Sequence, residues 1–219
     1  VSYKKIRPIA VRQVDTNYLI KRTTDKDFSH FDKKLLVIGC GSIGGYVISE
    51  LCKAGFKYIT VVDDDFLTEE NIYRHILGME YVGKYKSVAM KNFLEKNIPG
   101  NSIVSLEAKI EDVIDDGSIE LEDYDLIISA TGNHNINRWI NIYVHKKNVC
   151  IPIIYAWNEI HGIGNHVGYF KCGNEGCYEC LFGRDEDTFE KYDRSAYCAR
   201  GQKIVNNFGC GKSFIPYGN

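Results

Sequence analysis

The sequence has no surplus of charge of either sign: 27 Lys and Arg residues stand against 29 Asp and Glu residues, for a formal net charge of −2. Binding along a nucleic-acid backbone requires a surplus of cations, so this balance argues against nucleic acid as the main ligand. No apolar run approaches the roughly 18 residues that a membrane-spanning helix needs. The sequence shows no secretory signal, so we expect a cytoplasmic protein with neither nucleic acid nor a membrane as partner.

The chain also lacks an initiator methionine, internal repeats and low-complexity tracts, and it begins with Val1. We therefore expect a fragment of something longer. Its 219 residues are enough for one large domain or a domain with appendages. An apolar content of 44% is enough for a substantial core.

The eight cysteines are not spread in the manner of a disulfide framework. Cys40, Cys52 and Cys150 fall in or beside predicted strands and helices, where a thiol usually acts as a small buried apolar group. The other five gather near the C-terminal end and are Cys172, Cys177, Cys180, Cys198 and Cys210. Such clustering in a chain that resembles a cytosolic protein indicates metal binding or catalysis.

Hydrophobic patterning predicts an alternation of strands and helices between residues 35 and 155. The expected strands are Leu35–Ile38, Ile59–Val62, 103–107, Leu126–Ala130 and Ile151–Tyr155. The expected helices are 43–54, 84–96 and 134–146. Continuous apolar strands between amphipathic helices indicate an α/β fold: a doubly wound, Rossmann-like, mostly parallel sheet with helices on both faces.

The two ends of the chain do not follow this alternation. Residues 1–34 are weakly periodic and carry Arg7, Arg12 and Arg22, so we expect an N-terminal arm leading into a domain over 35–219. From residue 156 onward the pattern is lost, which predicts an extension of the sheet followed by a long, cysteine-rich crossover loop over 170–219. Long ordered loops are usually functional.

A glycine motif points to a nucleotide. Gly39, Gly41 and Gly44 follow the first predicted strand and open a helix, in a G-x-G-x-x-G pattern. Glycines there let the backbone approach a phosphate, and the helix N-terminus supplies unpaired N–H groups. Asp63 ends the second strand about 20 residues after the turn, where an acid that binds ribose hydroxyls is expected.

The residues that follow are not typical of a dehydrogenase. Asn71 and Arg74 are spaced to face one pocket. Arg74 and Lys86 supply two cations, which suit a triphosphate better than a nicotinamide dinucleotide. Asp65 lies two residues after Asp63 and faces the same way.

Taken together, the patterns G-x-G-x-x-G, D-x-D, N-x-x-R, V-G-x-x-K and C-Y-x-C-L-F resemble the ThiF/MoeB/ubiquitin-activating adenylation family, over nearly the whole chain from residue 35. The segments GCGSIG and NIYRHILG most resemble bacterial ubiquitin-like activating enzymes, including those of antiphage CBASS operons that are fused to a conjugating enzyme. The segments NINRWIN and GCYEC also resemble the microcin-type branch, which adenylates peptides.

The resemblance implies that ATP reacts with the C-terminal carboxylate of a small protein to give an acyl-adenylate and pyrophosphate. It implies that Asp63 holds the ribose and that further residues contact the phosphates: Asn71, Arg74, His75 and Lys86. It also implies a homodimer in which Arg22 reaches the partner subunit's site. Many relatives bind Mg²⁺ through Thr-Asp-Asn, but this chain has Thr131-Gly132-Asn133, so Asp65 or another acid is expected to take the metal.

The cysteines carry two further expectations. Cys177 and Cys180 form a C-x-x-C pair that fits two ligands of a tetrahedral Zn²⁺, with Cys172 and Cys198 available to complete the set. Free thiols are the alternative. The resemblance makes Cys210, in the crossover loop, the expected acyl acceptor, with Cys198 as the second candidate. A thiolate is a strong nucleophile, and nearby cations lower its pKa.

These observations predict an adenylation domain that activates a ubiquitin-like protein with ATP and then forms a thioester, in a chain that ends before its domain does. Three alternatives stay open. One is a sulfur-carrier or peptide adenylyltransferase without a thioester step. The second is an NAD-dependent oxidoreductase. The third is a non-catalytic scaffold that has lost magnesium chemistry.

Overall fold

The computed structural model describes residues 7–21, 32–159, 162–173, 176–184, 186 and 191–197. Arg22, Cys198 and Cys210 lie outside the described residues, so their expected roles stay predictions. Within the N-terminal arm, α1 (Thr16–Ile20) begins after Asp15, whose side chain accepts the N–H of Tyr18.

Six strands form one sheet in the order β3-β2-β1-β4-β5-β6. Their bounds are β1 Lys34–Ile38, β2 Tyr58–Val62, β3 Ser102–Leu106, β4 Leu126–Ser129, β5 Ile153–Asn158 and β6 Asn165–Phe170. The first five strands pair in parallel and β6 pairs antiparallel to β5. The predicted doubly wound sheet is therefore confirmed, and β6 is the extension expected after residue 156.

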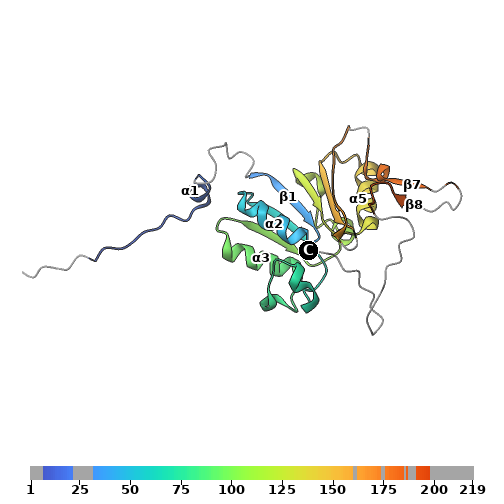
Figure 1. Ribbon diagram of the computed structural model, residues 1–219. Coiled ribbons are helices and arrows are strands. Elements are labelled where there is room, and N and C mark those ends of the chain that lie inside the picture. The colour runs from blue at the N-terminus through green and yellow to red at the C-terminus, as the bar shows by residue number, and fades with distance from the viewer. Residues whose placement is uncertain are drawn as a thin grey trace, which may run out of the picture.

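Alternate side chains of β1 enter two cores on opposite faces of the sheet. Leu35 and Val37 pack with residues of α2 and α3, whereas Leu36 and Ile38 pack with residues of α4 and α5. Figure 1 shows α2 and α3 together on one side and α5 on the other. The helices are α2 Gly44–Lys53, α3 Lys86–Asn97, α4 Ile110–Asp115 and α5 His134–Lys147. Because both faces are covered, the central strands read as continuous apolar runs.

Two departures from the predicted elements have simple causes. Helix α4 has only six residues, too few for its periodicity to stand out. Strand β5 begins at Ile153 rather than Ile151, after Pro152, whose ring leaves it no N–H for a ladder bond. The remaining elements are short: the 3₁₀ helices η2 Glu69–Arg74, η3 Met79–Tyr81, η4 Leu121–Asp123 and η6 Tyr178–Leu181, and the strands β7 Phe182–Arg184 and β8 Lys191–Asp193.

The strand order reverses direction at β1, since the chain runs outward through β2 and β3 on one side and through β4 and β5 on the other. Open α/β sheets bind ligands at such a point, beyond the carboxyl ends of the strands. A ligand site is therefore expected where β1, β2 and β4 end. Among the described residues, no helix is both long and apolar enough to cross a membrane.

Candidate functional site

A cavity of about 890 Å³ opens at the carboxyl ends of the central strands. Ile38, Val62 and Ala130, at the ends of β1, β2 and β4, form part of its wall. The cavity brings together nearly all the residues predicted to bind a nucleotide: Gly39, Gly41, Asp63, Asp65, Asn71, Arg74, His75 and Lys86. The third glycine of the motif, Gly44, lies just behind it at the start of α2.

The three glycines of the turn are required for three different reasons. Gly39 has a φ of 91°, in the left-handed region that favours glycine. A Cβ at Gly44 would lie 1.9 Å from the carbonyl oxygen of Gly39, so only glycine lets α2 start this close to β1. A Cβ at Gly41 would meet nothing within 4 Å, because it would point into open space. Gly41 is therefore explained by the approach of a ligand and not by packing.

Asp63 connects the end of β2 to the glycine turn. One carboxylate oxygen accepts the backbone N–H of Cys40, and the other accepts the N–H of Asp65 at 2.9 Å. Burial raises the pKa of Asp63, while these two N–H groups and Lys86 oppose the shift. An ionised carboxylate has about four acceptor positions. Two remain for ribose hydroxyls, which is consistent with the predicted role.

The 3₁₀ helix η2 presents Asn71 and Arg74 to the cavity, since residues three apart in a 3₁₀ helix lie on one face. The Asn71 side-chain oxygen accepts the N–H of Thr68, which leaves its NH₂ group toward the cavity as a donor. The Arg74 guanidinium donates to the carbonyl of Glu70 at 3.1 Å and makes no ion pair with the described residues. Four of its five N–H donors remain for an anion.

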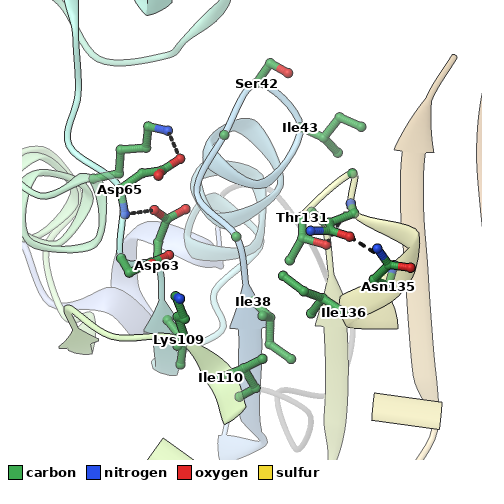
Figure 2. A pocket seen from close by; sticks show the side chains of 18 of the residues that line it. Ile38, Ser42, Ile43, Asp63, Asp65, Lys109, Ile110, Thr131, Asn135 and Ile136 are labelled. Atoms are coloured by element: carbon green, nitrogen blue, oxygen red, sulfur yellow. Dashed lines mark hydrogen bonds and ion pairs between the residues drawn. The ribbon is translucent and has the colours of Figure 1, made fainter. Parts of the chain in front are cut away.

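Lys86, at the first turn of α3, forms an ion pair with Asp65 at 2.7 Å. The lysine side chain is 11% exposed and the aspartate side chain 69% exposed. Asp65 thus holds the ammonium at the cavity wall through one oxygen and exposes the rest of its carboxylate to solvent, as Figure 2 shows.

His75 lines the cavity, but most of its side chain is buried behind it. It is 5% exposed, and its two ring nitrogens already bond to backbone groups: Nε2 to the Cys40 carbonyl and Nδ1 to the Leu77 N–H at 3.1 Å. Neither nitrogen is left for a phosphate in this arrangement. Burial lowers the pKa of His75, and the nearby charges of Lys86 and Arg74 lower it further.

The opposite end of the cavity is mostly apolar, with Lys109 beside it, and was not predicted. Ile38, Ile110 and Ile136 gather there, away from Ser42 and Asp65 (Figure 2). Trp139, one turn after Ile136 on α5, adds an aromatic surface. In a chain that alternates strands and helices, such residues look like ordinary core. The only available signal was position: Ile38 ends β1, Ile110 follows the end of β3, and Ile136 and Trp139 follow the end of β4.

The turn after β4 also contributes to the cavity. Thr131, Gly132 and Asn133 line it. Asn133 caps α5 by accepting the N–H of Asn135 at 2.9 Å, and Thr131 accepts the N–H of Asn133 at 3.1 Å. Gly132 has a φ of 64°, and a Cβ there would meet nothing within 4 Å. No carboxylate stands at this turn, as the sequence indicated.

The cysteine region matches the prediction only in part. Cys177 and Cys180 lie together at the start of η6, with their sulfur atoms 3.9 Å apart. Cys172 does not join them: it is a free thiol that lies beside the thiol of Cys150. Among the described residues no three His, Cys, Asp or Glu side chains are grouped to hold a metal. Within that part of the chain, Cys172 therefore does not complete a set with Cys177 and Cys180.

Comparison with known proteins identifies the fold and the family. The ThiF family description matches residues 16–204. An ATP-dependent ubiquitin transferase-like protein Cap2 of Pseudomonas aeruginosa is 31% identical over 182 residues, which cover 81% of this chain and 32% of that protein. The NEDD8-activating enzyme E1 catalytic subunit of Schizosaccharomyces pombe is 27% identical and is matched over 69% of this chain and 34% of its own length.

Among solved structures, Escherichia coli MccB with ATP superposes with a TM-score of 0.58 at 28% identity. The match covers 68% of this chain and 43% of MccB. This chain spans about a third of the length of the curated relatives named above. None of these relatives supports the NAD-dependent oxidoreductase alternative. The matched residues include the glycine turn, Asp63, η2 and Lys86, and the chain belongs to the ThiF family.

Proposed function

We propose that this chain is the adenylation module of an enzyme that uses ATP to activate the C-terminal carboxylate of a small protein, ubiquitin-like or otherwise. One observation carries the proposal: a single cavity joins the glycine turn, Asp63, Arg74 and Lys86. Its polar end suits a triphosphate and ribose, and its apolar end, with Trp139, suits a base.

In the proposed reaction, a carboxylate oxygen attacks the α-phosphorus of ATP, the bond to the bridging oxygen breaks, and pyrophosphate leaves. Phosphoryl chemistry of this kind depends mainly on positioning and charge stabilisation. Arg74 and Lys86 supply the positive charge, and the unpaired N–H groups at the start of α2 face the phosphates. Asp63 holds the ribose through its free acceptor positions.

Mg²⁺, when bound, would neutralise phosphate charge and orient the leaving pyrophosphate. The exposed carboxylate of Asp65 is the donor on this cavity that fits such a hard cation. Asp65 already bonds to Lys86, so the same side chain would hold both charges at the phosphate end.

Exchange of labelled pyrophosphate into ATP, in the presence of a candidate partner protein, tests the proposal. Removing a preorganised donor costs about 2.7–4 kcal/mol of transition-state stabilisation, so Arg74→Ala and Lys86→Ala should each slow exchange at least a hundredfold. Lys84→Ala is the matched control. Lys84 is two residues before Lys86 and carries the same charge, but its side chain lies over the ring of Tyr81. Exchange that survives both substitutions would overturn the roles. No exchange with any partner would favour the scaffold.

We also propose a symmetric dimer in which Arg22 acts in the partner subunit's site. Mixing Arg22→Ala with Lys86→Ala subunits provides a sharp test. A mixed dimer has one site with both defects and one site with neither, so mixing two weakly active variants should restore activity. If Arg22 acts within its own subunit, mixing restores nothing.

The next proposed step is capture of the acyl group by a cysteine. The thiolate attacks the acyl carbon, a thioester forms and AMP leaves. Cys210→Ala should still exchange pyrophosphate but lose a thiol-sensitive adduct with the partner, whereas Cys198→Ala should keep it. The reverse result would assign the role to Cys198. An intact enzyme without any adduct would favour the sulfur-carrier or peptide-modifying branch.

Cys177 and Cys180 suit half of a zinc site. Two sulfur ligands at about 2.3 Å from a tetrahedral Zn²⁺ lie about 3.8 Å apart, and these two sulfur atoms are 3.9 Å apart. We propose that they bind Zn²⁺ with ligands from outside the described residues. Elemental analysis of the purified protein should find zinc, and Cys177→Ser should lose it. Cys150→Ser is the control, and equal zinc in both variants would contradict the assignment.

A further inference from the structure

His75 is a buried histidine whose hydrogen bonds define its protonation state. The Leu77 backbone N–H points at Nδ1 from 3.1 Å, and an N–H group can only donate. Nδ1 must therefore be unprotonated, and the ring proton lies on Nε2, which donates to the carbonyl of Cys40. His75 is thus a neutral ring in one tautomer, and it joins the loop after η2 to the glycine turn.

The bond to Cys40 matters because of where this residue lies. Cys40 is the second residue of the glycine turn, and its N–H is already held by Asp63. With the carbonyl held by His75, both polar groups of Cys40 are fixed. In a trans peptide, the carbonyl of one residue and the N–H of the next point in opposite directions. Fixing the Cys40 carbonyl therefore aims the Gly41 N–H away from His75.

The backbone N–H groups of Gly41 and Ser42 are the donors that this arrangement leaves for a ligand. Within the described part of the chain, neither Gly41 nor Ser42 donates its backbone N–H to a protein acceptor. Both residues line the cavity, and a Cβ at Gly41 would project into open space. These are the properties of backbone donors prepared for an anionic ligand.

We propose that neutral His75 is a positioning residue that holds the glycine turn in its nucleotide-binding form and makes no contact with the phosphates. The proposal rests on the proposed function only in taking this cavity as the ATP site. Its consequence is a specific response to acid. A protonated ring carries N–H on both nitrogens, so Nδ1 would face the Leu77 N–H donor to donor. The turn then loses its support, and nucleotide affinity falls.

The surroundings favour the neutral ring. Arg74 and Lys86 stand near it with positive charge, and burial and these charges lower the pKa of His75. On the side of the glycine turn it faces Cys40, whose thiol is kept neutral because burial raises its pKa well above the usual range. The Asp63 carboxylate lies beyond Cys40 and is held by two N–H groups. Among the residues that the structure describes, no carboxylate contacts the ring to stabilise its charged form.

The test is ATP affinity by calorimetry in the wild type, His75→Gln and His75→Ala, between about pH 5.5 and about pH 8, a range that spans the ordinary pKa of histidine. A glutamine carboxamide donates and accepts, so it reproduces both bonds without titrating. At neutral pH, His75→Gln should bind ATP as the wild type does, and His75→Ala should bind about tenfold more weakly, as for loss of one to two hydrogen bonds. On acidification, the wild type should lose affinity more steeply than His75→Gln.

The sign of the pH response separates the alternatives. If His75 instead contacted the phosphates, protonation would add a positive charge there, and wild-type affinity would rise in acid relative to His75→Gln. That rise, or unchanged affinity in His75→Ala, would overturn the proposal. Thermal unfolding in parallel identifies a merely structural role, in which stability falls but ATP affinity and its pH response do not change. If the wild type binds no ATP at any pH, the proposed function fails instead.

Discussion

Two turns border the same cavity, one after β1 and one after β4, and they are built in opposite ways. In the first, Gly44 packs against Gly39 so closely that a Cβ would lie 1.9 Å from a carbonyl oxygen, and both polar groups of Cys40 are bonded. In the second, Gly132 adopts a φ of 64°, and a Cβ there would meet nothing within 4 Å. The first turn is fixed by backbone packing and the second is open.

The difference shows how one fold can keep a binding geometry while its chemistry changes. The turn after β1 presents backbone N–H groups, and an added atom at Gly44 would disturb their positions. In the turn after β4, a side chain at position 132 would project into free space, so this residue can change without moving the sheet. This chain carries glycine at the position where many of its relatives are expected to carry the metal-binding aspartate. Site-directed variants can test whether the two turns differ in this way.

Gly44→Ala should have the largest effect. The new methyl group would collide with the Gly39 carbonyl, so α2 must move away from β1. We expect the free energy of unfolding to fall by about 3 kcal/mol, the upper part of the usual range for overpacking. Chemical denaturation measures it. Gly78→Ala is the control, because a Cβ there meets nothing and φ is not positive. A wild-type denaturation curve for Gly44→Ala would show that the turn is not fixed by packing.

Gly41→Ala should separate binding from folding. The methyl group has free space in the empty protein, so stability should be unchanged or higher by about 0.5 kcal/mol through a stiffer unfolded chain. The same space is needed by the phosphates, so ATP should bind about tenfold more weakly, a loss of about 1.4 kcal/mol. Calorimetry and denaturation on one preparation measure both. A variant that binds ATP normally would place the phosphates elsewhere.

Gly132→Asp should add what the second turn lacks. A residue other than glycine in the left-handed region loses about 1 kcal/mol of stability, and Asp loses less than most. The space around position 132 is open, so the new side chain meets no neighbour. Pyrophosphate exchange should then rise at low Mg²⁺ concentration, because a second carboxylate reaches the metal. Gly132→Asn has the same size without the charge and serves as the control. An equal response of both variants would exclude a metal role for this turn.

The sequence predicted the first turn and its neighbours well because their geometry is local. The motif spacing fixes Gly39, Gly41 and Gly44 at a strand-to-helix turn, and Asp63 ends the adjacent parallel strand. Asn71 and Arg74 share a face because they are three residues apart in η2. Each of these positions follows from short-range spacing and the order of the strands.

The remaining features depend on contacts that spacing does not encode. His75 bonds to Cys40 across 35 residues, so its supporting role is a tertiary property. The apolar end of the cavity draws on α4, which is too short to detect. The free thiols of Cys172 and Cys150 lie beside each other because the β5–β6 hairpin brings its two ends together, although Cys177 is nearer to Cys172 along the chain.

The smallest expected effect is on acid stability, where each turn is supported by a histidine. His75 backs the first turn, and His134 follows the second. Tyr178 accepts a bond from Asn137 at 3.1 Å and forms a second bond with Nδ1 of His134 at 2.6 Å. Burial lowers the pKa of both histidines. Below about pH 6.5, the ordinary value, the unfolded chain therefore takes up protons that the folded chain excludes.

Stability should consequently fall as the pH falls from about 6.5, by less than about 1.4 kcal/mol per pH unit for each histidine. His75→Gln and His134→Gln should each flatten this slope. The change should be larger for His75, because burial is the main cause of both shifts and His75 is buried whereas His134 is only partly buried. Denaturation at several pH values measures the slopes, with His145→Gln at the end of α5 as control. A larger change of slope in His134→Gln would mean that the histidine beside the turn after β4, and not His75, contributes more to the pH dependence of stability.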